Sequence, residues 1–143
     1  MLLALLLMAL AASAAEPPPA DDRKPLHLTP RMAAHQKANM RHHLEAVQSL
    51  VTALSAEDYD KVASAARSMG AAPDTLRMCR HMGEGNPLDF TERAVAFHES
   101  ADRIAAAAES HDRGRVLTAL SDTLAACTGC HAIYRQEVLL DHP

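Results

Sequence analysis

Cys127, Cys130 and His131 lie in the sequence Cys-Thr-Gly-Cys-His near the C-terminus, and their types and spacing indicate redox chemistry. Cys-x-x-Cys-His is the attachment sequence of a c-type haem. The two thiols add to the vinyl groups of the porphyrin, and the imidazole binds the iron. Residues three and four positions apart share one face of an α-helix. We therefore expect one covalent haem c, with His131 as an iron ligand.

Other uses of a Cys-x-x-Cys pair fit this sequence less well. A thioredoxin-like couple belongs beside a βαβ pattern, and a zinc site needs four nitrogen or sulfur ligands. The sequence shows neither the pattern nor a second ligand pair. A motif without chemistry stays open as a third alternative. Cys79, the third cysteine, is flanked by Arg77 and Arg80, which could lower its pKa, although we expect an ordinary thiol.

Four amphipathic segments can position this motif. Helices are expected over residues 30–54, 59–69, 90–109 and 113–140, each with apolar residues at steps of three and four. Residues 71–89 are expected to form a long connection with at most one helical turn. No strand is predicted. The sequence thus predicts an all-α, antiparallel four-helix bundle with the haem near the end of the last helix.

The same periodicity predicts which side chains point inward. These are Met40, Leu44, Val47, Val51 and Leu54; Tyr59, Val62, Ala66 and Met69; Ala94, Phe97, Ala101, Ile104 and Ala108; and Leu117, Leu120, Leu124, Cys127, His131, Tyr134 and Val138.

The N-terminal region predicts export. Residues 2–12 form an apolar run followed by the small-x-small sequence Ala12-Ser13-Ala14, so residues 1–15 are expected to be a signal peptide and the mature protein periplasmic. Residues 16–27 are rich in proline and charge and are expected to form a flexible tether, and residues 28–143 the helical domain. The apolar run is too short to span a bilayer, and no span is expected in the mature chain.

Composition excludes some functions. The chain has 143 residues and a net charge of −4 with histidines neutral. It has no basic block and few aromatic residues, so nucleic acid is not an expected partner. No nucleophile–base pair or catalytic pair of carboxylates is evident, and we do not expect an enzyme.

The residues Cys127 to Arg135, CTGCHAIYR, resemble the CxxCHxxYR ending of the cytochrome c′ family, the class II c-type cytochromes. This resemblance spans roughly residues 28–140. It implies a four-helix bundle that exchanges electrons with transient redox partner proteins. It also implies that Arg135 lies beside the proximal imidazole and tunes the haem. The alternative is an exposed cation near a helix C-terminus.

The segment Gln36 to Arg41 resembles the family's first helix and puts Met40 at the distal position. The resemblance then implies a low-spin iron held by Met40 and His131 and suited to one-electron transfer. His43 as the sixth ligand is one alternative. Another is no sixth ligand, in which case the protein binds NO or CO. The resemblance also allows a homodimer, although Arg41 and Glu45 put charge on the first helix.

Overall fold

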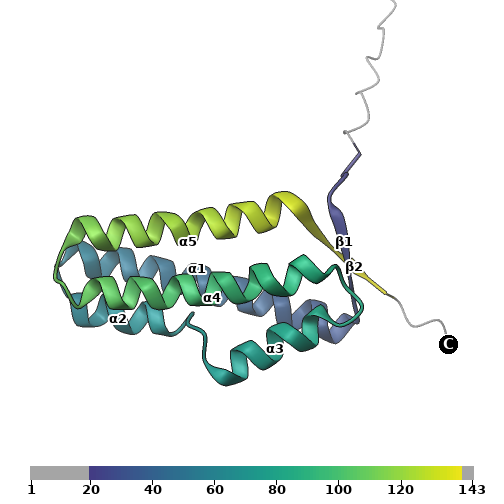
Figure 1. Ribbon diagram of the computed structural model, residues 1–143, viewed down its shortest axis with the longest axis horizontal. Helices are drawn as coiled ribbons and strands as arrows, with labels where there is room; N and C mark the ends of the chain where they lie inside the picture. Colours follow the sequence, from purple (N-terminus) through teal and green to yellow (C-terminus); the bar gives the residue numbers. More distant parts are fainter. Residues whose placement is uncertain (1–19, 140–143) are drawn as a thin grey trace, which may run out of the picture.

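The computed structural model describes residues 20–139, which form five helices and two short strands (Figure 1). The predicted all-α class is confirmed. The predicted signal peptide and residues 16–19 of the tether lie outside the described residues. The elements in chain order are β1 (Lys24–Leu28), α1 (Pro30–Ser55), α2 (Tyr59–Arg67), α3 (Pro73–Gly83), α4 (Leu88–Ala108), α5 (Arg113–Ile133) and β2 (Tyr134–Val138).

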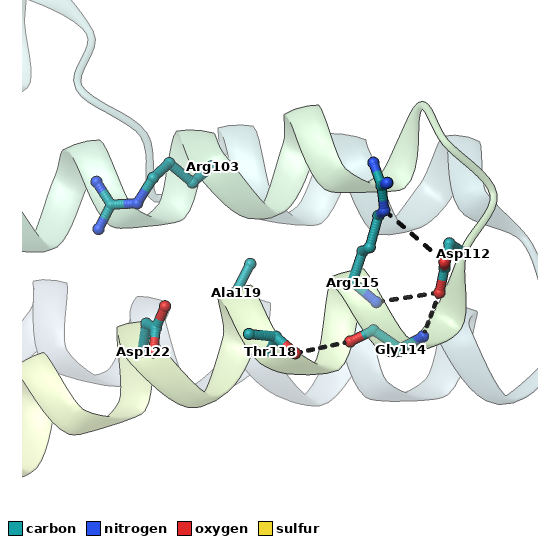
Figure 2. Close-up of a pocket in the computed structure, with 7 residues that line it drawn as sticks. All are labelled: Arg103, Asp112, Gly114, Arg115, Thr118, Ala119 and Asp122. Carbon is teal, nitrogen blue, oxygen red and sulfur yellow. Dashed lines mark hydrogen bonds and ion pairs between the residues drawn. The ribbon is translucent and has the colours of Figure 1, made fainter.

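Two of the long helices, α1 and α5, begin at side-chain caps that the sequence signals. The Thr29 hydroxyl accepts a hydrogen bond from the Met32 N–H at the start of α1, where Pro30 takes the first helical position. At the start of α5, the Asp112 carboxylate accepts from the N–H groups of Gly114 and Arg115, at 2.8 and 3.1 Å (Figure 2). Each cap satisfies N–H groups that have no partner inside the helix.

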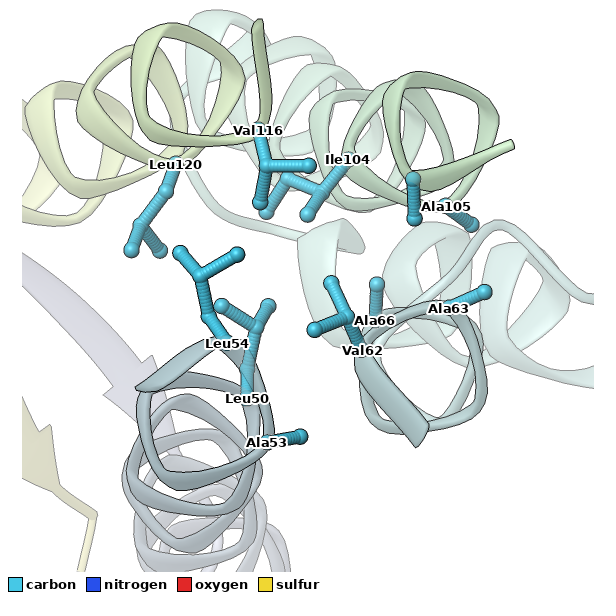
Figure 3. Packing of buried hydrophobic residues seen from close by; sticks show 11 residues of the cluster. Leu50, Ala53, Leu54, Val62, Ala63, Ala66, Ile104, Ala105, Val116 and Leu120 are labelled. Carbon is cyan, nitrogen blue, oxygen red and sulfur yellow. The ribbon is translucent and has the colours of Figure 1, made fainter. Parts of the chain in front are cut away.

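The main core lies at the end of the molecule where α2 packs and where α4 turns into α5. There α1 packs on α2, α2 on α4, and α4 on α5 (Figure 1). Small residues alternate with branched ones, which lets the helices approach closely. We call this region the closed end; its buried residues, most of them shown in Figure 3, are Leu50, Ala53, Leu54, Val62, Ala63, Ala66, Ile104, Ala105, Ala108, Val116 and Leu120.

The inward faces of α1 and α5 are partly different from those predicted. Leu44 and Val51 are 71% and 49% exposed, and Leu117 and Leu124 on α5 are 49% and 41% exposed. The buried face of α1 differs from the predicted one because the helix packs on α2, whereas the backbones of α1 and α5 make few close approaches. The predicted inward faces of α2 and of the second half of α4 are confirmed, with Val62 and Ile104 fully buried.

The connection over residues 71–89 contains a helix that was not predicted. Helix α3 has Pro73 in its first turn and Arg80 and His81 in its last turn, and it ends at Gly83. It packs on α4. These are ordinary helix start and stop signals, so the prediction of at most one helical turn was wrong.

The prediction that the chain contains no strand was also wrong. Strands β1 and β2 pair in parallel, with Lys24 opposite Tyr134 and Leu28 opposite Val138. Leu26 and Leu28 are buried, packing near Phe90. The predicted tether therefore does not reach residue 27, because its last residues are fixed in this ladder. For the same reason the last helix ends at Ile133 and not at residue 140.

By length and apolar composition alone, α5 would be able to cross a membrane, which we did not anticipate from the sequence. The helix nevertheless packs along α4 and contributes Val116, Leu120 and Thr123 to the buried interior.

Candidate haem-binding site

A cavity of about 1040 Å³ lies between the helices at the end opposite the closed end. It is at the upper limit of the size typical of cofactor sites. Its walls come from the first half of α1, from α3, from the first half of α4 and from the last turns of α5. Residues of β1 and β2 also line it. We call this region the cavity end.

The cavity contains the complete attachment motif. Cys127, Cys130 and His131 all line it, and both cysteines are half-buried free thiols. Burial raises the pKa of each thiol, and at Cys130 the Arg93 guanidinium opposes this effect. Since α5 is helical through Ile133, the three side chains share one helix face as predicted.

Met40 lines the same cavity from α1 and is 40% exposed. The chain therefore brings the predicted distal methionine into one cavity with the predicted proximal histidine, 91 positions away in sequence. Met78 of α3 lines the cavity as well and is similarly exposed, at 37%. Both thioethers are thus available to a ligand in the cavity.

His43, the alternative ligand, lies deeper in the wall. Its ring is 4.7 Å from the Phe97 ring and 5.4 Å from the His98 ring, centroid to centroid. Burial, with the nearby imidazoles of His98 and His42, lowers the pKa of His43 to about 4. His43 is therefore neutral at neutral pH, as an iron ligand must be. His98 is anchored through its Nδ1–H, which donates to the Met69 carbonyl oxygen at 2.7 Å.

The cavity lining carries more positive than negative charge. Arg23, Arg93 and Arg135 are each paired with a carboxylate, whereas Lys37 and Arg41 of α1 form no ion pair with the described residues. Lys37 and Arg41 lie four positions apart and so occupy one side of the helix. The two propionates of a haem would be compensated by this excess.

Arg135 lines the cavity, but it does not lie one helical turn beyond His131. It follows the end of α5, in β2, where its guanidinium pairs with Glu137 at 2.8 Å. Next to it, Gln136 donates a hydrogen bond to the Gln36 side chain at 2.5 Å. The side chain of Gln36, at the position four before Met40, is therefore already engaged by β2.

The Tyr134 hydroxyl is buried and has no hydrogen-bond partner among the described residues. Burial, with the nearby carboxylate of Asp89, raises the pKa of Tyr134 to about 12. Its ring packs edge-on against Phe90 at 5.6 Å, in the small core beneath the strands. A phenol in such surroundings stays protonated throughout the physiological range.

Sequence reasoning missed the contribution of α3 and β1 to the cavity. Met78, Cys79 and Met82 line it from α3, and Arg23 and Leu26 from the N-terminal segment. Helix start and stop signals could have revealed α3, whereas β1 depends on its pairing with β2, more than 100 positions away. Burial raises the pKa of Cys79, so the neighbouring arginine Arg80 does not activate this thiol.

The residues fit a haem. The cavity has an adequate volume, two thiols and an imidazole on one helix face, apolar walls and surplus cations. The second hollow, at the N-terminus of α5, is smaller, and its N–H groups are already bonded to Asp112 (Figure 2). A mainly helical body with Cys-x-x-Cys-His facing such a cavity is the arrangement expected of a helical haem protein.

The comparison with family models is in agreement. The family model described as Cytochrome C' matches residues 85–135, which include all of α4, all of α5 and the attachment motif. This segment of the chain is therefore similar to the cytochrome c′ family. No curated protein matches, and no solved structure matches.

Proposed function

We propose that this protein is a periplasmic electron carrier. It holds one haem c through thioether bonds to Cys127 and Cys130, with His131 as the proximal and Met40 as the distal iron ligand. The haem supplies a reversible one-electron change at iron. The observation that carries this proposal is that Met40 of α1 lines the same cavity as the Cys-x-x-Cys-His motif of α5.

The chain's own residues account for the remaining requirements. The lining exposes more apolar than polar surface, and apolar surroundings favour the reduced, less charged iron. Lys37 and Arg41 provide positive charge for the propionates. Electron transfer needs no paired general acid and base, so this proposal does not require the protein to be an enzyme in the classical sense. Redox partners dock transiently in this proposal, as electron-transfer proteins do.

The first experiment establishes the cofactor. The full chain is produced in cells able to attach haem c, and the periplasmic protein is weighed by mass spectrometry. The proposal expects the mass of the processed chain plus one haem, and a low-spin visible spectrum in both oxidation states. A colourless protein with the mass of its amino acids alone would refute it.

The second experiment identifies the distal ligand with a matched pair of variants. Met40→Ala is expected to give a high-spin spectrum. Met78→Ala, which removes an equally exposed thioether from the same cavity, is expected to stay low-spin. If Met40→Ala leaves the spectrum unchanged, Met40 is not the ligand, and loss of the low-spin spectrum in His43→Leu would then assign His43.

The alternative function is binding of NO or CO at an open sixth position. The half-exposed Met40 side chain would then be only distal packing. Rapid, tight CO binding by the ferrous wild-type protein, together with a high-spin spectrum, would favour this alternative over electron transfer.

A further inference from the structure

The C-terminal end of α5 is fastened by an arginine from the opposite end of the chain. The last carbonyl groups of a helix lack partners inside it, and α5 ends two residues after His131. The Arg23 Nη1 donates to the His131 carbonyl oxygen at 3.2 Å, and the Tyr134 carbonyl oxygen lies 3.5 Å away. The guanidinium therefore takes the place of the missing helical donor at the proximal residue itself.

Arg23 is itself held in place from two sides. The Asp21 carboxylate accepts from its Nε at 2.8 Å and from its Nη2 at 2.7 Å, a bidentate pair that fixes the plane of the guanidinium. This hydrogen bonding raises the pKa of Arg23 and lowers the pKa of Asp21 to about 2, so both stay charged. The next residue, Lys24, begins the parallel ladder with β2.

The ladder makes this contact part of a continuous strap, residues 21–28. Leu26 and Leu28 bury their side chains beneath the strands, and β2 follows α5 directly. Asp21 and Arg23 also line the cavity. The strap therefore forms hydrogen bonds with the backbone on both sides of Ile133, where the helix that carries the attachment motif ends.

We infer that Arg23 is a positioning residue for the proximal ligand: through the His131 carbonyl group it fixes the backbone that carries the imidazole. The inference rests on the proposed function, since it concerns the same haem. Because Asp21 neutralises the guanidinium, loss of Arg23 leaves an unpaired carboxylate at the cavity, and this negative charge favours the ferric state, which carries one more positive charge. A fixed peptide also limits the reorientation of His131 when the iron changes its oxidation state.

The test measures the reduction potential and visible spectrum of the full haem-loaded protein and of Arg23→Ala, Arg23→Lys and Lys24→Ala. Arg23→Ala is expected to lower the potential and broaden or shift the haem absorption. Arg23→Lys, which keeps the charge and one donor, is expected to restore most of the potential. Lys24→Ala removes a charge one residue away, where the lysine pairs with Asp89 and not with α5, and is expected to shift the potential less.

The outcomes separate cleanly. Equal shifts of the reduction potential in Arg23→Ala and Lys24→Ala would mean that only net charge matters. An unchanged potential and spectrum in Arg23→Ala, with reduced stability, would mean that Arg23 only stabilises the packing of the strap. Either result overturns the inference. If Arg23→Ala does not accumulate, Asp21→Ala loosens the same guanidinium, and an unaltered potential in that variant also overturns it. Absence of haem from the wild-type protein would instead refute the proposed function.

Discussion

The two ends of the molecule differ in how their helices pack: one end has a solid core and the other surrounds a cavity. At the closed end, Leu50, Val62, Ile104 and Val116 are fully buried and the helices pack against one another. At the cavity end, α1, α4 and α5 surround a cavity of about 1040 Å³ together with α3 and residues of the two strands. The closed end thus stabilises the fold, while the cavity end is lined by the residues that would contact the haem in the proposed function.

The difference teaches that small residues have opposite uses along one helix. In α4, Ala101, Ala105 and Ala108 bring the neighbouring helices close together. On the same helix, nearer its start, Ala94 lines the cavity, where a small side chain leaves room. Composition alone does not distinguish these uses, whereas position relative to the neighbouring helices does.

The largest expected effect comes from removing both thiols at the cavity end. In the double variant Cys127→Ala and Cys130→Ala, no thioether bond can form, and covalent haem is expected to be lost completely. Mass spectrometry measures the loss. Loss of the haem is expected to accelerate hydrogen exchange, and least at the closed end, because that core contains neither cysteine. Equal deprotection of both ends would contradict the difference between them.

The next largest effect is expected at the closed end. Ile104→Ala removes a fully buried side chain from the main core and is expected to lower the free energy of unfolding by about 2–4 kcal/mol. The visible haem spectrum is expected to stay that of the wild type. Urea unfolding measures the first quantity. A change of spin state in this variant would show that the two ends are not independent.

A smaller effect is expected from pH at the cavity end. The pKa of His43 is about 4 in the folded protein and about 6.5 in an unfolded chain. The unfolded state therefore binds more protons between these values, and stability falls as the pH drops from about 6.5 to 4. Allowing for partial exposure, His43 contributes up to about 2 kcal/mol of this loss.

The measurement compares urea unfolding at pH 7 and pH 5 for the wild type and His43→Leu. The variant is expected to lose less stability on acidification, because it has no imidazole to protonate at this position. His111 is a suitable control, since it is exposed and stacks on Tyr59 at the closed end. An identical pH dependence in wild type and His43→Leu would contradict the lowered pKa.

The smallest effects are expected from the two helix caps. Asp112→Ala removes the cap of α5 at the closed end, and Thr29→Ala removes the cap of α1 at the cavity end. Each is expected to lower the free energy of unfolding by about 1 kcal/mol. Thermal unfolding measures both. Only Thr29→Ala is expected to alter haem absorption slightly, and an effect of Asp112→Ala on the spectrum would again argue against independent ends.

Much of the site was predictable because it depends on local spacing. The face shared by Cys127, Cys130 and His131 follows from helical periodicity, which holds wherever α5 packs. The start of α1 at Thr29 and Pro30 was equally local. The exposure of Leu44 and Val51 was not predictable in this way, since their periodicity fits a core-facing stripe and only the neighbouring helices decide what they face.

The sequence by itself therefore determined the helical class, the caps of α1 and α5 and the attachment motif, because each depends on interactions between residues a few positions apart. Only the tertiary structure decided that Met40 shares a cavity with His131, and that Arg23 reaches the carbonyl group of His131. It also decided that the segment beginning at Lys24 is a strand. These contacts join residues about 90 to 110 positions apart, and the chain can form them only after the helices have packed and oriented the partners.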